Sequence, residues 1–256
     1  MEAFHYKKGE SPLIVSMPHI GLEIPDDIKA HMTDAGKEMV DTDWNIDRLY
    51  DFLWAMDVTI IGAKYSRYVV DLNRGTDGVS LYPGQTVTTL CPTHTFNGDP
   101  LYQDGYEIDE ADRINKYWLP YHEMLAKELR RLKEKHGYVR LWDAHSIKSH
   151  VPELFDGRLP DLNLGTGNGI SADHALVEKL ENIVRTSDYS SVLNGRFKGG
   201  YITRHYGDPK NQIHAVQLEI SQITYMNELS NEFDQDKVEK LRNILKALIK
   251  IMSGSP

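Results

Sequence analysis

Two apolar runs, each with a histidine at its end, indicate the fold class: Leu13-Ile14-Val15-Ser16-Met17-Pro18-His19 and Val139-Arg140-Leu141-Trp142-Asp143-Ala144-His145-Ser146. The length and apolar content of each run predict a short buried strand that delivers an imidazole to its carboxyl end. In an α/β protein, the loops at the carboxyl ends of central strands converge on one point and bind ligands there. The two histidines, His19 and His145, therefore predict a shared metal ion.

The rest of the chain alternates strand-like and helix-like segments, which predicts an α/β fold. We expect further strands at 58–63, 68–72, 192–194, 200–203 and 214–220, and helices at 26–35, 42–55, 109–136, 171–186 and 234–252. Two stretches between them, 73–108 and 147–170, are irregular. The first contains repeated Gly and Pro and is longer than a connection needs, so we expect it to be functional or to pack as a lid.

Composition and charge restrict the classes of partner. The chain has 256 residues, of which 40% are hydrophobic, so it can bury a large core, and we expect a single domain spanning 1–256. A formal charge of −9 argues against nucleic acid and anionic membranes as partners. The first residues lack the apolar core of a signal peptide, and no run approaches the roughly 20 apolar residues of a membrane span, so we expect a cytoplasmic protein. Its oligomeric state stays open.

A metal site needs a third ligand besides the two histidines. Catalytic zinc commonly takes two His and one carboxylate and keeps one position for water. Glu23 lies four residues after His19, and Asp43 lies at the start of an expected helix. Glu23 is equally compatible with a solvated loop charge, and Asp43 with a helix cap, so the residues alone leave both open. Asp143 shares a strand face with His145 and can orient the metal ligands by hydrogen bonding, without binding the metal itself.

Six motifs follow one another between about residues 12 and 228: Pro18-His19-x-Gly21, Thr42-Asp43-Trp44, Ser66-Arg67-Tyr68-Val69-Val70-Asp71-Leu72-Asn73-Arg74, Trp142-Asp143-Ala144-His145-Ser146, Asn194-Gly195-Arg196-Phe197-Lys198-Gly199-Gly200-Tyr201-Ile202-Thr203-Arg204-His205-Tyr206-Gly207 and Gln217-Leu218-Glu219-Ile220. In this combination the chain resembles the N-formylglutamate amidohydrolase family. The resemblance implies a three-layer α/β sandwich with a central mixed sheet, phosphorylase/hydrolase-like and related to zinc carboxypeptidases and aspartoacylases. It also implies hydrolysis of N-formyl-L-glutamate to formate and L-glutamate at the end of a histidine degradation route.

The resemblance implies roles for individual residues as well. His19 and His145 match metal-binding histidines, and Asp43 is preferred as the third ligand because the family has an aspartate before an aromatic residue at this point. Related acylases place a glutamate shortly after the first histidine, but Glu23 lies one residue further on than that pattern. One divalent ion is expected, with Zn²⁺ as the first candidate, although this ligand set suits several metals.

Two further residues are expected to act on the reacting atoms. Glu219 would serve as general base and then as general acid, unless it forms a structural ion pair with an arginine. Arg67 is the candidate for stabilising the charge that develops on the formyl oxygen.

Recognition of a substrate with two carboxylates calls for arginines, whose planar fork binds a carboxylate in two-pronged fashion. Asn73 and Arg74 resemble the Asn-Arg pair with which related acylases hold the α-carboxylate, and Arg204 is the candidate for the side-chain carboxylate. Either arginine could instead tie down a loop through backbone carbonyls. Two alternatives stay open: a zinc hydrolase of the same fold acting on another N-acyl amino acid or a peptide C-terminus, and a non-catalytic anion-binding protein.

Overall fold

The computed structural model describes residues 2–79 and 88–254, and its centre is a mixed β-sheet. Seven strands pair in the order β1-β3-β2-β4-β7-β5-β6. Their bounds are β1 Phe4–Lys7, β2 Leu13–Met17, β3 Thr59–Ala63, β4 Val139–Ile147, β5 Leu162–Gly165, β6 Ser191–Leu193 and β7 Ile213–Ser221. The central strands β3, β2, β4 and β7 run parallel, whereas β1 pairs antiparallel with β3, and β5 with β7.

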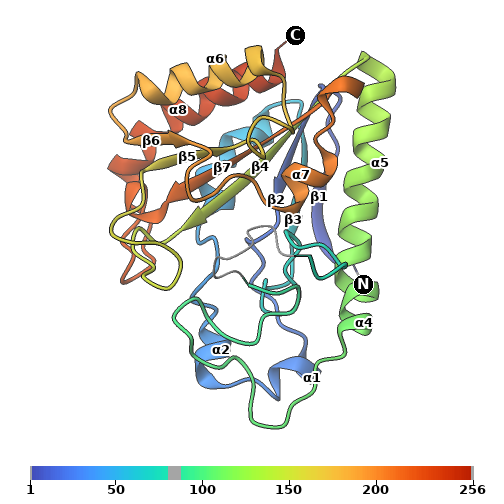
Figure 1. Cartoon of the computed structure of the whole chain (residues 1–256), viewed down its shortest axis with the longest axis vertical. Coiled ribbons are helices and arrows are strands. Elements are labelled where there is room, and N and C mark those ends of the chain that lie inside the picture. Colours follow the sequence, from blue (N-terminus) through green and yellow to red (C-terminus); the bar gives the residue numbers. More distant parts are fainter. Residues whose placement is uncertain (1, 80–87, 255–256) are drawn as a thin grey trace.

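Helices cover both faces of this sheet, as Figure 1 shows. On one face lie α3 Ile46–Leu49, α6 His174–Arg185 and α8 Gln235–Ser253; on the other lie α5 Leu119–His136 and α7 Tyr201–Tyr206. The strands alternate between two cores because successive side chains point to opposite faces. In β2, Leu13 and Val15 pack with α8, and Ile14 packs with α5. The predicted α/β class and mixed central sheet are therefore confirmed.

The central strands β4 and β7 set the position of the functional residues. They pair over nine residues in parallel register, which places His145 beside Glu219 and Asp143 beside Gln217. All nine residues of β4 are buried, as expected for a parallel strand covered on both faces.

The helix expected at 109–136 is confirmed. It runs from α4 Glu110–Arg113 through a π-helical turn, Ile114–Trp118, into α5. Gly137 ends it with φ 79°, a left-handed conformation that glycine adopts at little cost. The helices expected at 171–186 and 234–252 correspond to α6 and α8.

Two strand predictions are wrong, and in each case side chains bond the backbone in place of a neighbouring strand. Residues 68–72 form turns, and the Val69 carbonyl accepts a hydrogen bond from the buried Arg113. Residues 200–203 belong to the start of α7, where Gln217 Oε1 accepts from Gly200 N and Asn73 Oδ1 accepts from Ile202 N. The apolar pattern within one segment does not show which distant side chains will form hydrogen bonds with its backbone.

Other boundaries differ as well. The segment 26–35 contains α1 Asp26–Lys29 and the start of α2 Asp34–Glu38, and 42–55 contains α3 followed by a 3₁₀ turn, Asp51–Ala55. Strand β1 was not predicted, and β5 lies within a stretch expected to be irregular. Part of the expected lid, 80–87, lies outside the described residues. Within the described ranges, no helix has the length and apolar character needed to cross a membrane.

Candidate metal centre

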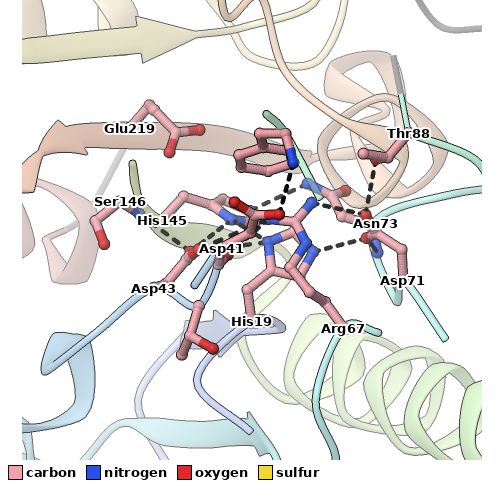
Figure 2. A network of polar contacts seen from close by, with 12 residues as sticks. His19, Asp41, Asp43, Arg67, Asp71, Asn73, Thr88, His145, Ser146 and Glu219 are labelled. Carbon is pink, nitrogen blue, oxygen red and sulfur yellow. Dashed lines mark hydrogen bonds and ion pairs between the residues drawn. The ribbon is translucent and has the colours of Figure 1, made fainter. Parts of the chain in front are cut away.

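Three buried side chains from distant parts of the chain converge at the carboxyl ends of β2 and β4 (Figure 2). His19 follows β2, His145 lies near the end of β4, and Asp43 precedes α3. The Nδ1 atoms of the two histidines are 3.1 Å apart, and Asp43 Oδ2 lies 3.2 Å from His145 Nδ1 and 3.7 Å from His19 Nδ1. Ligand atoms of tetrahedral zinc lie about 3.3 Å apart, so the three positions suit one small cation.

The opposite nitrogen of each imidazole faces a second carboxylate. His19 Nε2 lies 2.6 Å from Asp71 Oδ1, and His145 Nε2 lies 3.0 Å from Asp143 Oδ2. Carboxylates in this position hold the ring proton on Nε2 and leave the Nδ1 lone pair for a metal. Two lone pairs and the Asp43 carboxylate then face one another, and Asp43 Oδ1 is buried with no hydrogen-bond partner among the described residues. This donor set fits a divalent cation.

The surroundings shift the pKa values of the two histidines in opposite directions. Burial lowers the pKa of His145, but Asp143 and Asp43 outweigh burial and raise it well above its usual value. Burial and the nearby Arg67 lower the pKa of His19. The carboxylates of Asp143 and Asp43 thus favour positive charge at the place where a cation would bind.

Asp43 and Glu23, the two carboxylates considered as a third ligand, differ in position. Glu23 is exposed and forms an ion pair with Lys64, whose Nζ lies 3.5 Å from Glu23 Oε2. Asp43 is 1% exposed, and its Oδ2 also accepts a hydrogen bond from Ser146 N at 3.0 Å. Asp43 thus belongs to the cluster, and Glu23 lies outside it.

A cavity of about 60 Å³ adjoins the cluster, and Glu219 lines it. Glu219 Oε2 accepts a hydrogen bond from Gln217 Nε2 at 3.2 Å, and within the described ranges no arginine or lysine pairs with it. Burial raises the pKa of Glu219 to about 8, with His145 lowering it and Asp43 raising it further. A carboxyl group with a pKa near neutrality can both accept and donate a proton at physiological pH.

Asp71 is a site residue that sequence reasoning missed. It is fully buried, and its two oxygens reach His19 Nε2 and, at 2.8 Å, the Nη2 of Arg67 (Figure 2). Burial raises the pKa of Asp71, but His19 and Arg67 outweigh it and hold that pKa well below its usual range. The sequence signal for it is an aspartate inside the apolar stretch 68–72, whose composition predicts a strand.

Arg67 lines the same cavity, beside the cluster of His19, Asp43 and His145. Its Nη1 lies 3.9 Å from Asp43 Oδ1, and its guanidinium carbon lies 4.9 Å from the centre of the Phe96 ring. Its Nε is buried without a hydrogen-bond partner in the described part of the chain. The structure therefore brings Arg67 into the cavity next to Asp43.

Asn73 and Arg74 also line the cavity, but both make bonds within the protein. Asn73 Oδ1 accepts a hydrogen bond from Ile202 N at 2.9 Å, and a side chain at Gly200 would collide with the Asn73 amide, which explains that glycine. Arg74 donates to Thr88 O, Thr88 Oγ1 and Asn73 O, each at 2.9 Å. Arg74 thus ties down its loop, as the alternative interpretation had it, while still facing the cavity.

The glycine-rich segment brings a different arginine to the cavity from the one expected. Arg204 lies on α7, donates its Nε to Gly199 O at 2.8 Å and is not among the described residues that line the cavity. Arg196 does line it. The spacing of arginines in the sequence could not reveal this difference, because it depends on where α7 begins.

Comparison with known proteins gives a consistent result. The family model for N-formylglutamate amidohydrolase matches residues 11–226. Two curated proteins called N-formylglutamate deformylase are similar over nearly the whole chain: one from Pseudomonas putida is 47% identical, covering 98% of this chain and 94% of its own, and one from Pseudomonas aeruginosa is 48% identical, covering 97% and 95%.

Two solved structures show a similar fold. The N-formylglutamate amidohydrolase of Ralstonia eutropha superimposes with a TM-score of 0.84 at 22% identity, covering 98% of both chains. A protein of Agrobacterium tumefaciens superimposes with a TM-score of 0.71 at 17% identity, covering 98% of this chain and 96% of its own. At these identities the likeness concerns the fold alone.

Proposed function

Because this chain belongs to the N-formylglutamate amidohydrolase family, we propose that it hydrolyses N-formyl-L-glutamate to formate and L-glutamate. The observation that carries the proposal is the convergence of His19, Asp43 and His145 next to an arginine-lined cavity that Glu219 also lines. The partner is then a small dicarboxylate. The reaction would stand at the end of a histidine degradation route, as the family resemblance implies.

The three converging side chains would hold one divalent cation, with Zn²⁺ as the first candidate. A cation bound there supplies Lewis-acid chemistry: it polarises a carbonyl and lowers the pKa of water toward about 7. Asp71 and Asp143 keep the histidine rings oriented for this ligand set. Ligands at the carboxyl ends of parallel strands also favour the relation to zinc carboxypeptidases and aspartoacylases that the motifs imply.

Glu219 would move the protons. It takes a proton from the water that attacks the formyl carbon, and it gives a proton to the amide nitrogen as the C–N bond breaks. The products are then formate and the free amine of glutamate. The burial of Glu219 supports this role, because a pKa raised to about 8 favours return of the proton to the leaving amine.

Arg67 would stabilise the oxygen of the formyl group as it gains negative charge. Its position beside Asp43 and its unpartnered Nε support this role. Asn73 and Arg74 would face the α-carboxylate. Arg74 has five N–H donors and uses three of them on its loop, so it retains two for an anion.

The deciding experiment measures formate release from N-formyl-L-glutamate by the purified protein after chelation and after addition of Zn²⁺, Co²⁺ or Mn²⁺. We expect turnover only in the presence of metal. Faster hydrolysis of N-acetyl-L-glutamate would favour a related hydrolase with another acyl preference. Binding of the substrate without turnover under all metal conditions would contradict the proposal and favour an anion-binding protein.

A further inference from the structure

The residues that line the cavity beside His19 and His145 are of two kinds. The metal end of the cavity is formed by His19, His145 and Glu219, which are polar and buried. Four other lining residues are apolar and belong to one small hydrophobic cluster: Phe96, Ile147, Leu154 and Phe197. A substrate that places its formyl group at the metal end can therefore lay its side-chain methylenes against apolar side chains.

Three arginines line this cavity within the described residues: Arg67, Arg74 and Arg196. Arg67 is held at the metal end by its ion pair with Asp71. Arg74 is bound to the loop that carries Asn73. Arg196 instead lies beside the small hydrophobic cluster, because its Nε donates to Leu154 O at 2.6 Å and its guanidinium carbon lies 5.4 Å from the centre of the Phe197 ring.

We propose that Arg196 binds the side-chain carboxylate of the substrate and thereby determines the preference for an acidic over a neutral side chain. This inference rests on the proposed function and replaces the expectation that Arg204 has this role. The bond to Leu154 O orients the guanidinium plane in advance, which lowers the conformational entropy lost on binding. The apolar side chains of Leu154 and Phe197 beside it limit its contact with water, and a charge-assisted pair is stronger where water is scarce.

The carboxyl and amide forms of one side chain provide the test, because N-formyl-L-glutamate and N-formyl-L-glutamine have nearly the same shape. For the full-length protein loaded with Zn²⁺, we expect kcat/KM for the glutamate substrate to exceed that for the glutamine substrate about 100-fold. In Arg196→Met, this ratio should fall to within about threefold. The decrease in kcat/KM should affect the glutamate substrate and should come mainly from a higher KM. Hydrolysis of the glutamine substrate should stay nearly unchanged, which would show that the reacting centre is intact.

Two further variants keep the test specific. Arg196→Gln retains a donor for Leu154 O but no charge, and it should lose the same preference. Arg158→Met is the matched control, because Arg158 is exposed, pairs with Asp161 and is not among the described residues that line the cavity. It should retain the wild-type ratio.

Several outcomes would overturn the proposal. One is an Arg196→Met protein that keeps the wild-type ratio or loses both substrates equally, and another is an Arg204→Met protein that loses the preference while Arg196→Met keeps it. A wild-type protein that hydrolyses both substrates equally would overturn this inference alone. If the wild type hydrolyses neither, the proposed function itself fails.

Discussion

The metal end of the cavity and the loop arginines Arg74 and Arg196, here called the recognition end, differ in how their side chains are held. At the metal end, His19 and His145 extend from strand ends, and each ring is fixed by its own buried carboxylate. At the recognition end, Arg74 and Arg196 come from loops, and both donate to backbone carbonyls. Strand ends therefore place reactive atoms with little freedom, whereas the loop arginines depend on bonds to neighbouring loops. Substitutions at the two ends should differ accordingly in size and kind.

The largest effect is expected for His145→Ala. Loss of one of three ligands should remove the metal and lower turnover by about 1,000-fold or more, since the cation contributes several kcal/mol to the transition state. Metal content measured by mass spectrometry, together with formate release, checks this. A variant with the wild-type metal content would contradict the ligand assignment. Glu23→Ala, outside the cluster, is the matched control and should keep its metal.

Glu219→Gln should separate proton transfer from metal binding. We expect a full complement of metal and a loss of kcat of about 10²- to 10⁴-fold, because the amide cannot carry the proton. Metal analysis and steady-state kinetics on the same preparation measure both quantities. Full turnover in this variant would remove Glu219 from the mechanism.

Asp71→Asn should weaken metal affinity about 10- to 100-fold, because Asp71 orients the His19 ring and also holds Arg67. The readout is competition for Zn²⁺ with a chromophoric chelator, which does not depend on activity. Asp112→Asn, at an exposed ion pair with Lys116, serves as control and should bind metal like the wild type. Wild-type affinity in Asp71→Asn would show that Asp71 has no positioning role.

Arg74→Lys tests the recognition end and should have a smaller effect. Lysine cannot reproduce the three bonds of Arg74 to Thr88 and Asn73 or present a planar fork to a carboxylate. We expect KM to rise about tenfold with kcat changed less. Kinetics identical to the wild type would mean that Arg74 does not contact the substrate.

The smallest expected effect concerns stability rather than turnover. His122 is buried next to the loop that carries Asn73, where its Nε2 donates to Leu72 O. Its ring stacks on that of Trp118, with 3.8 Å between the ring centres. Burial lowers the pKa of His122 to about 3, so between pH 6.5 and 3 the unfolded chain binds more protons than the folded one. The free energy of unfolding should therefore decrease as the pH is lowered, and it should be about 2 kcal/mol smaller at pH 5 than at neutral pH.

Chemical unfolding of the wild type and of His122→Gln at pH 7.5 and pH 5 measures this contribution. The variant is expected to be less stable at pH 7.5 but to lose less stability on acidification. An equal pH dependence in both proteins would assign the acid sensitivity to other groups.

Sequence patterns predicted the elements whose structure depends on a single segment of chain. The two strands that carry His19 and His145 and the long helix ending at Gly137 agree with the structure, because each follows from apolar periodicity or a stop signal within one segment. The same patterns gave a wrong prediction where side chains distant in sequence form hydrogen bonds with the backbone of a segment. The segment 68–72 has the composition of a strand, but its Val69 carbonyl is bonded by Arg113, 44 residues away.

Residue types and motif order alone were enough to establish the family, the mixed α/β class and the two histidines, since all three are encoded in short stretches of chain. Folding was needed to bring Asp43, Asp71 and Glu219 to those histidines and to turn Arg196, in place of Arg204, toward the cavity. Such convergence depends on strand order and on loop-to-loop hydrogen bonds between residues far apart in the chain. No local pattern encodes the distance or direction of those contacts.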